Sequence, residues 1–167
     1  MLQCDYCITS VQLTLGDEMS ADIFPEKNNI ESLLNEGKTL QLKPLGFSMY
    51  PLIVPERDEV IVAPIKGHKI KRGDILLYRR INSKLIIHRV VKSRDNSLYM
   101  CGDNEDFVEG PVSKDQVFGI LTGFIRKGKK HSISNPLYFL YWNIWLILLP
   151  FRKPISKFIH SIKKVRK

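Results

Sequence analysis

Short apolar runs alternate with polar positions throughout the middle of the chain. Between residues 40 and 125 these runs are rich in Val, Ile and Leu, and Gly, Pro, Asn and charged residues separate them. Runs of this length and composition favour β-strands. The pattern predicts strands over 40–45, 59–63, 74–79, 85–91, 98–101 and 117–125. Strands at this spacing indicate a mainly β fold, built as coiled sheets or a partly open barrel.

The N-terminal part follows a different pattern. Residues 1–25 predict an extended arm with a weak strand signal over 11–15. A short helix is expected from residue 28 or 29 to 36, because Asn can cap it and its apolar residues recur at helical spacing. We therefore divide the chain into an arm with a short helix (1–38), a β domain (39–130) and a helical tail (131–167).

The tail combines a uniformly apolar segment with a basic one. Residues 137–151 are apolar except for Asn143 and Pro150, and these 15 residues fall short of the roughly 20 that a membrane-spanning helix needs. Residues 155–164 predict an amphipathic basic helix. Aromatic residues followed by Lys and Arg are typical of helices in the headgroup region. The residues expected to bind a membrane are Trp142, Trp145, Arg152, Lys153 and Lys157. A helical hairpin packed on the domain or on a dimer partner is the alternative.

Charge is distributed unevenly. The net charge is +9, and residues 116–167 hold 11 Lys and Arg with no Asp or Glu. This asymmetry points to an anionic partner surface. We expect a membrane rather than a nucleic acid, because the basic residues adjoin a large apolar segment. No export signal or anchor is visible before residue 17, so membrane association on the cytoplasmic face is the expectation.

The cysteines predict neither a disulfide framework nor a metal site. The chain has three, of which Cys4 and Cys7 form a C-x-x-C pair near the N-terminus. A structural zinc site needs about four ligands, and the sequence has no second pair. We expect no metal and no other cofactor.

The residues that carry chemistry are a hydroxyl, an imidazole and a group of carboxylates. Ser48 lies between Gly46 and Pro51, just after a predicted strand, and His88 lies within the strand over 85–91. A neighbouring base must remove the proton of a serine before it attacks, and a carboxylate orients that base. The candidate carboxylates are Asp103, Asp106 and Glu109. An ordinary turn serine, a core histidine and a simple turn at 102–104 are the alternatives.

Five segments in register, from about residue 42 to 125, resemble the clan of type I signal peptidases and SOS-repressor-type proteases. They are Ser48-Met49-x-Pro51, Arg72-Gly73-Asp74-Ile75, His88-Arg89-Val90-Val91, Gly102-Asp103-Asn104 and Val117-Phe118-Gly119. The match at His88 is similar to the endoplasmic-reticulum and archaeal members, in which a histidine replaces the lysine base.

The resemblance implies a mostly β serine peptidase with Ser48 as nucleophile and His88 as base. In histidine-type members the orienting Asp lies six residues beyond the Asp of Gly-Asp-Asn, and that offset falls here on Glu109. Some signal peptidases carry a serine two positions before the nucleophile, where this chain has Gly46. An oxyanion hole would then use the backbone N–H groups of Ser48 and Met49.

The leading expectation is therefore a serine endopeptidase that cleaves an extended leader-like or signal-like peptide near a membrane surface. A catalytically inactive, peptidase-like binding module docked on a membrane or partner is the alternative. A self-cleaving regulator is less favoured. The region before Ser48 is too short for a DNA-binding domain and linker, no Ala-Gly dipeptide precedes it, and a lysine base is absent from the matching position.

Overall fold

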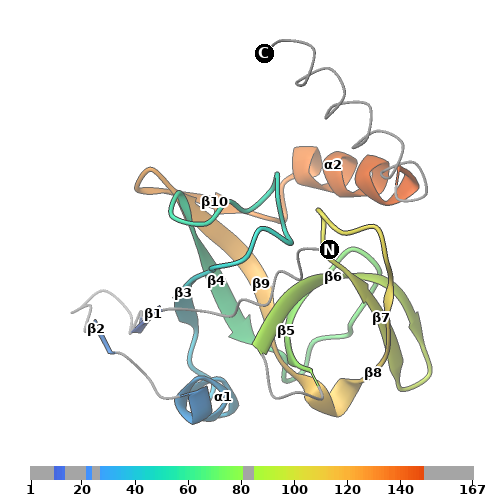
Figure 1. Cartoon of the computed structure of the whole chain (residues 1–167). Coiled ribbons are helices and arrows are strands. Elements are labelled where there is room, and N and C mark those ends of the chain that lie inside the picture. The colour runs from blue at the N-terminus through green and yellow to red at the C-terminus, as the bar shows by residue number, and fades with distance from the viewer. Residues whose placement is uncertain (1–9, 14–21, 24–26, 81–84, 149–167) are drawn as a thin grey trace.

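A single antiparallel sheet organises the molecule. The structure, a computed structural model, describes residues 10–13, 22–23, 27–80 and 85–148. In that part of the chain ten strands follow the order β2-β1-β3-β4-β9-β5-β6-β7-β8, and β10 pairs with β9 (Figure 1). The strands are β1 (Ser10–Leu13), β2 (Asp22–Ile23), β3 (Leu40–Lys43), β4 (Asp58–Pro64), β5 (Ile75–Arg79), β6 (Leu85–Arg94), β7 (Ser97–Cys101), β8 (Glu109–Ser113), β9 (Val117–Arg126) and β10 (Lys129–Ser132). The helices are α1 (Lys27–Asn35), the short 3₁₀ helix η1 (Lys114–Gln116) and α2 (Pro136–Ile147).

The expectation of a mainly β fold is confirmed. Each strand predicted between residues 40 and 125 is present, with ends shifted by no more than three residues. The sheet is open, since β2 and β8 end the strand order without pairing with each other among the described residues.

Two described strands after residue 40, β8 and β10, were not predicted from the sequence. The sequence of β8 contains Gly110-Pro111, and β10 reads Lys-Lys-His-Ser, so neither shows apolar alternation. β10 forms because Lys127 and Gly128 adopt positive φ values of 51° and 72°. Two such residues make the hairpin turn whose twist matches paired strands. Turn geometry, rather than hydrophobicity, therefore creates this strand.

Apolar residues form two cores, and β5 and β6 contribute to both. The first core gathers residues from α1, β3, β4, β5, β6 and β9, including Leu34, Leu40, Leu42, Val60, Ile75, Leu77, Leu85 and Leu121. The second gathers Leu76, Tyr78, Val90, Leu98, Met100, Val112, Val117 and Ile120. Successive side chains of a strand point to opposite faces. His88 and Arg89, neighbours on β6, are therefore separated, and His88 lies beside Tyr78 of the second core.

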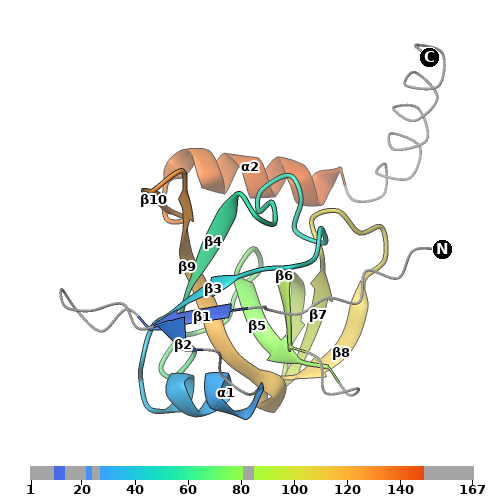
Figure 2. The same cartoon turned by 60° about the vertical axis from the view of Figure 1, so that its left-hand side comes forward.

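Helix α2 lies along one end of the β domain, over the loop after β3 and the loop between β7 and β8 (Figures 1 and 2). Asn135 caps it by accepting a hydrogen bond from the N–H of Leu137, and Pro136 opens it. One side packs on the domain, where Leu146 is buried. The opposite side exposes four residues at spacings of three and four, Leu137, Leu140, Ile144 and Ile147. Among the described residues, α2 included, no helix has the length and apolar character to cross a membrane.

The described helix covers only part of the predicted tail. Residues 137–147 pack on the β domain along one side and leave an apolar stripe on the other. The amphipathic helix predicted over 155–164 lies outside the described residues.

Candidate active site

The loop that carries Ser48 is anchored at its far end by a buried carboxylate. Asp58, at the start of β4, is only 2% exposed and accepts a hydrogen bond from the N–H of Val54. Arg126 reaches over from β9 to bind both Asp58 oxygens and the carbonyl of Leu52. Burial opposes ionisation of Asp58, but hydrogen bonds from Arg126 and Arg57 hold its pKa well below the usual range. The loop after β3 is thus tied to the central strands.

At its near end the same loop contacts the turn that follows β7. The carbonyl oxygen of Ser48 accepts a hydrogen bond from the N–H of Asn104 at 2.7 Å. A Cβ on Gly102 would lie 2.6 Å from that oxygen and 3.0 Å from the side chain of Glu105. Only glycine allows this approach. The glycine of the Gly-Asp-Asn motif therefore has a steric reason, which is to let the Ser48 loop lie against the turn.

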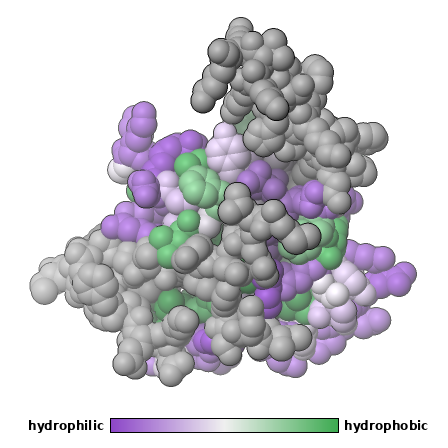
Figure 3. Space-filling model, viewed as in Figure 1, coloured by the Kyte–Doolittle hydropathy of each residue, from purple (hydrophilic) through white to green (hydrophobic). Residues whose placement is uncertain are grey.

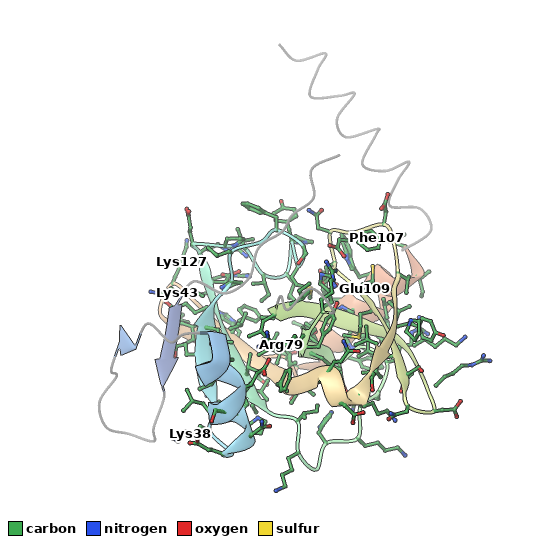
Figure 4. The ribbon with its side chains drawn as sticks, turned by 60° about the horizontal axis from the view of Figure 1, so that its bottom comes forward. Lys38, Lys43, Arg79, Phe107, Glu109 and Lys127 are labelled. Atoms are coloured by element: carbon green, nitrogen blue, oxygen red, sulfur yellow. The ribbon has the colours of Figure 1, made fainter. Side chains whose placement is uncertain are left out.

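His88 is almost completely buried, with 1% exposure, and a tyrosine bridges it to a carboxylate. Its Nδ1 lies 3.2 Å from the hydroxyl of Tyr78, which donates to Glu109 at 2.7 Å. Arg80 donates to both oxygens of Glu109, at 2.7 and 2.5 Å. Figure 4 shows Glu109 at the start of β8, two residues beyond the exposed Phe107. Glu109, one of the three candidate carboxylates, is thus linked to the imidazole through Tyr78.

This bridge favours one tautomer of the His88 imidazole. The Tyr78 hydroxyl donates its hydrogen bond to Glu109, so its oxygen can accept one from Nδ1–H of His88. In the tautomer with Nδ1 protonated, Nε2 keeps its lone pair. Burial lowers the pKa of His88 to about 4, against its ordinary value of 6.5. Burial also raises the pKa of Tyr78, and the hydrogen bond to Glu109 adds to that rise. His88 is therefore neutral near pH 7, as a general base must be.

A residue that sequence reasoning missed faces the other ring nitrogen. Glu105 places Oε2 3.5 Å from Nε2 of His88 and accepts a hydrogen bond from the N–H of Gly102 at 3.2 Å. Burial raises the pKa of Glu105. In the sequence Glu105 is one of four acidic residues between 103 and 109, and nothing singles it out. Only the curl of the turn brings it to His88.

Asp103 is placed on the opposite side of β6 from His88. Its two oxygens bind Arg89 at 2.7 and 2.6 Å, and both side chains are buried. Helix α2 encloses the pair. The Tyr138 hydroxyl accepts a hydrogen bond from Arg89 at 2.6 Å. Tyr141 donates a hydrogen bond to the Asp103 carboxylate at 3.3 Å, and Trp145 donates one to the Asp103 carbonyl at 2.7 Å. Asp103 therefore pairs with Arg89 and fixes the turn, and Asp106, in the same loop, is exposed.

The structure brings the Ser48 loop and His88 to the same turn without joining their side chains. The hydroxyl of Ser48 makes no hydrogen bond to His88 or to any other described residue. The N–H groups of Ser48 and Met49 likewise bond no described residue, and the Met49 side chain is buried in the first core. Hydrogen bonds of catalytic groups are often long in ligand-free structures. The hydroxyl and the two N–H groups are thus available for new bonds.

The residues predicted to bind a membrane fall into two groups. Trp142 and Trp145 lie half-buried on the side of α2 that faces the domain, because Trp142 packs on Gly73 and Trp145 bonds Asp103. Arg152, Lys153 and Lys157 lie outside the described residues, as do Cys4 and Cys7. Within 27–80 and 85–148, no cluster of His, Cys, Asp and Glu could hold a metal ion.

A scan of protein-family models and searches of the curated proteins and of the solved structures find no match to this chain.

Proposed function

We propose that this protein is a serine endopeptidase with Ser48 as nucleophile and His88 as general base. One observation carries the proposal: the turn at 102–105 contacts both residues, through Asn104 and Gly102 on the Ser48 side and through Glu105 on the His88 side. A buried neutral imidazole whose Nδ1 proton is held by a tyrosine–carboxylate bridge supports the role of base. The resemblance of the five sequence segments to the signal peptidase clan supports the same roles.

In the proposed reaction the Ser48 oxygen attacks the scissile carbonyl carbon while Nε2 of His88 takes the hydroxyl proton. The carbonyl oxygen becomes an oxyanion, and the N–H groups of Ser48 and Met49 donate to it. His88 then gives the proton to the leaving amine, which departs and leaves an acyl-enzyme. Water, activated in turn by His88, hydrolyses the ester and restores Ser48. The Glu105 carboxylate withdraws from Nε2 as the hydroxyl approaches.

The proposed substrate is an extended peptide. In the part of the chain that the structure describes, the sheet ends at β8, the strand that begins with Glu109. An open sheet edge can bind a peptide strand through main-chain hydrogen bonds. Phe47, Tyr50, Phe107 and Val108 are exposed on the two loops that meet at the 102–105 turn, and they offer apolar contacts for its side chains. A leader-like or signal-like sequence is the class that the family resemblance implies.

The second candidate is a peptidase-like module that binds a peptide without cleaving it. The position of Glu105 favours this function, because a carboxylate, rather than the Ser48 hydroxyl, is the group near Nε2 of His88. The two candidates make opposite predictions for the reactivity of Ser48.

The test is labelling of the full chain with an activated acylating reagent such as an activated ester, with the adduct located by peptide mass mapping. For the peptidase, wild type acquires one acyl group at Ser48, and Ser48→Ala acquires none there. His88→Ala should lower the labelling rate by roughly a thousandfold. Tyr78→Phe, which keeps the ring and removes the bridge to Glu109, should lower it by about tenfold to a hundredfold.

Ser93→Ala is the matched control, since Ser93 is exposed near the far end of β6. It should label at Ser48 at the wild-type rate. Equal labelling of Ser48 in wild type and in folded His88→Ala would refute the Ser–His pair and leave the binding module.

A further inference from the structure

A cavity of about 520 Å³ lies on a part of the molecule that the proposed reaction does not use. It is bounded by the segment before β5, the middle of β9, the turn before α2 and the first half of α2. Three aromatic residues of α2 line it, Tyr138, Phe139 and Trp142. Trp142 lies so close to Gly73 that a Cβ there would be 2.7 Å from the indole ring. The volume is in the range of small-molecule binding sites.

The rim of this cavity is cationic. The segment 66–72 reads Lys-Gly-His-Lys-Ile-Lys-Arg, and no Asp or Glu occurs between residues 60 and 73. Lys71 and Arg72 line the cavity, are exposed, and have no carboxylate partner among the described residues. Asp74, the one acidic residue of the lining, accepts from the Lys71 N–H at 2.9 Å and lies 3.0 Å from Nε2 of His68. The two free cations therefore dominate the field at the opening.

An apolar surface continues from the cavity along α2. Phe139 lines the cavity and is also 62% exposed. Its ring packs edge-to-face with Trp142, and the two ring centroids lie 5.2 Å apart. Beyond it lies the exposed stripe Leu137, Leu140, Ile144 and Ile147. The hydropathy view in Figure 3 shows the face seen in Figure 1 as a mixture of hydrophobic and hydrophilic side chains. On α2, in contrast, every exposed residue but the N-terminal Pro136 is a large apolar one.

We propose that the cavity binds the phosphate-bearing headgroup of an anionic phospholipid while the exposed stripe of α2 enters the membrane interface. Lys71 and Arg72 pair with the headgroup phosphate, and Phe139 and Trp142 contact its glycerol backbone. A cationic opening beside an apolar helix face complements a lipid, which carries negative charge and acyl chains in one molecule. A nucleic acid or a free anion matches only the charge. This docking is independent of catalysis at Ser48.

The test is binding of the full chain to phosphatidylcholine vesicles with and without phosphatidylglycerol, measured by co-sedimentation. Wild type should bind the anionic vesicles at least tenfold more strongly than the neutral ones. The double variant Lys71→Glu/Arg72→Glu should lose about tenfold in the partition coefficient on anionic vesicles. Ser134→Trp, which adds bulk to the cavity wall without changing charge, should also lower the partition coefficient on anionic vesicles.

The matched control is Lys92→Glu/Arg94→Glu, which makes the same charge change on exposed residues of β6. Its partition coefficient on anionic vesicles should fall by less than about threefold, which is the loss expected from the change in net charge alone. Equal losses in the two double variants would overturn the proposal and leave a non-specific charge attraction. Wild-type binding to inorganic phosphate in solution without binding to vesicles would also overturn it. Thermal unfolding of each variant confirms that it is folded.

Discussion

His88 and Arg89 are adjacent on β6, both are buried, and the structure treats them in opposite ways. Arg89 makes two short hydrogen bonds to Asp103, donates to Tyr138 and to the Gly73 carbonyl, and so has its charge fully compensated. His88 has only longer contacts, 3.2 Å to Tyr78, 3.5 Å to Glu105 and 3.9 Å to Glu109.

The difference separates a structural group from one that is open to reaction. A buried ion pair with every lone pair satisfied fixes geometry, and its partners cannot move without great cost. A neutral imidazole with one held nitrogen and one loosely contacted nitrogen can accept a proton. The Arg89 side thus holds the 102–105 turn in place, and the His88 side faces the groups that the turn presents.

The largest expected effect on stability is that of Arg89→Met, which tests the structural role of the Arg89–Asp103 pair. It leaves the Asp103 carboxylate buried without its partner, which should lower the free energy of unfolding by about 3–5 kcal/mol. Urea denaturation followed by tryptophan fluorescence measures the loss. Lys92→Met, an exposed position on the same strand, is the control and should change stability by less than about 0.5 kcal/mol. A loss below about 1 kcal/mol for Arg89→Met would contradict a structural role for the pair.

The pH dependence of stability tests whether burial keeps His88 neutral. The pKa of His88 is about 4 in the folded protein and 6.5 in an exposed histidine, so between these values the unfolded chain binds the extra proton. Stability is therefore complete above about pH 6.5 and falls as the pH drops to about 4, by up to about 3 kcal/mol.

Urea denaturation across this range, in wild type and in His88→Gln, isolates the contribution. The Gln variant should lose the part of the slope that comes from His88, while titration of Glu105 and Glu109 remains. Parallel curves for the two proteins would show that His88 is not held neutral by burial.

The smallest effect concerns the contact between α2 and the turn. Trp145→Phe keeps a ring that can stack on Tyr141, 5.7 Å away, but removes the hydrogen bond to the Asp103 carbonyl. The cost should be about 1 kcal/mol. Trp142→Phe is the matched control, since Trp142 packs on Gly73 and makes no hydrogen bond to a described residue through its indole N–H. Equal stability losses, measured by urea denaturation, would assign the effect to ring size alone.

Prediction from the sequence succeeded where the local pattern carries the information. Strand alternation in the sequence places Ile86, His88 and Val90 on one face of β6, and in the structure Ile86 and Val90 both pack in or against the second core. It failed for partners that are distant along the chain. Asp103 was a candidate to orient His88, whereas it pairs with Arg89, and Glu105 was overlooked. Residue types in a turn do not reveal which carboxylate points to which strand.

In the tail, the sequence likewise predicted the helix but not which of its sides faces the domain. Its composition correctly indicated a helix with a large apolar surface, but the two tryptophans chosen as membrane contacts face the domain. A helix that is apolar all round carries no periodic signal for its buried side. The side was decided by hydrogen-bonding partners, since Tyr138, Tyr141 and Trp145 bring polar groups to the Arg89–Asp103 pair.

Local sequence patterns were enough to predict the apolar strands between residues 40 and 125 and the basic character of the C-terminal third. They also placed Ser48 just after one predicted strand and His88 within another, forty residues further along the chain. These are local properties, set by side-chain shape, alternation and charge. Tertiary structure alone decided that one turn lies between Ser48 and His88, that a tyrosine links His88 to Glu109, and that a cationic cavity opens beside α2. Such contacts join distant segments, and they depend on how the sheet curves and where each loop crosses it.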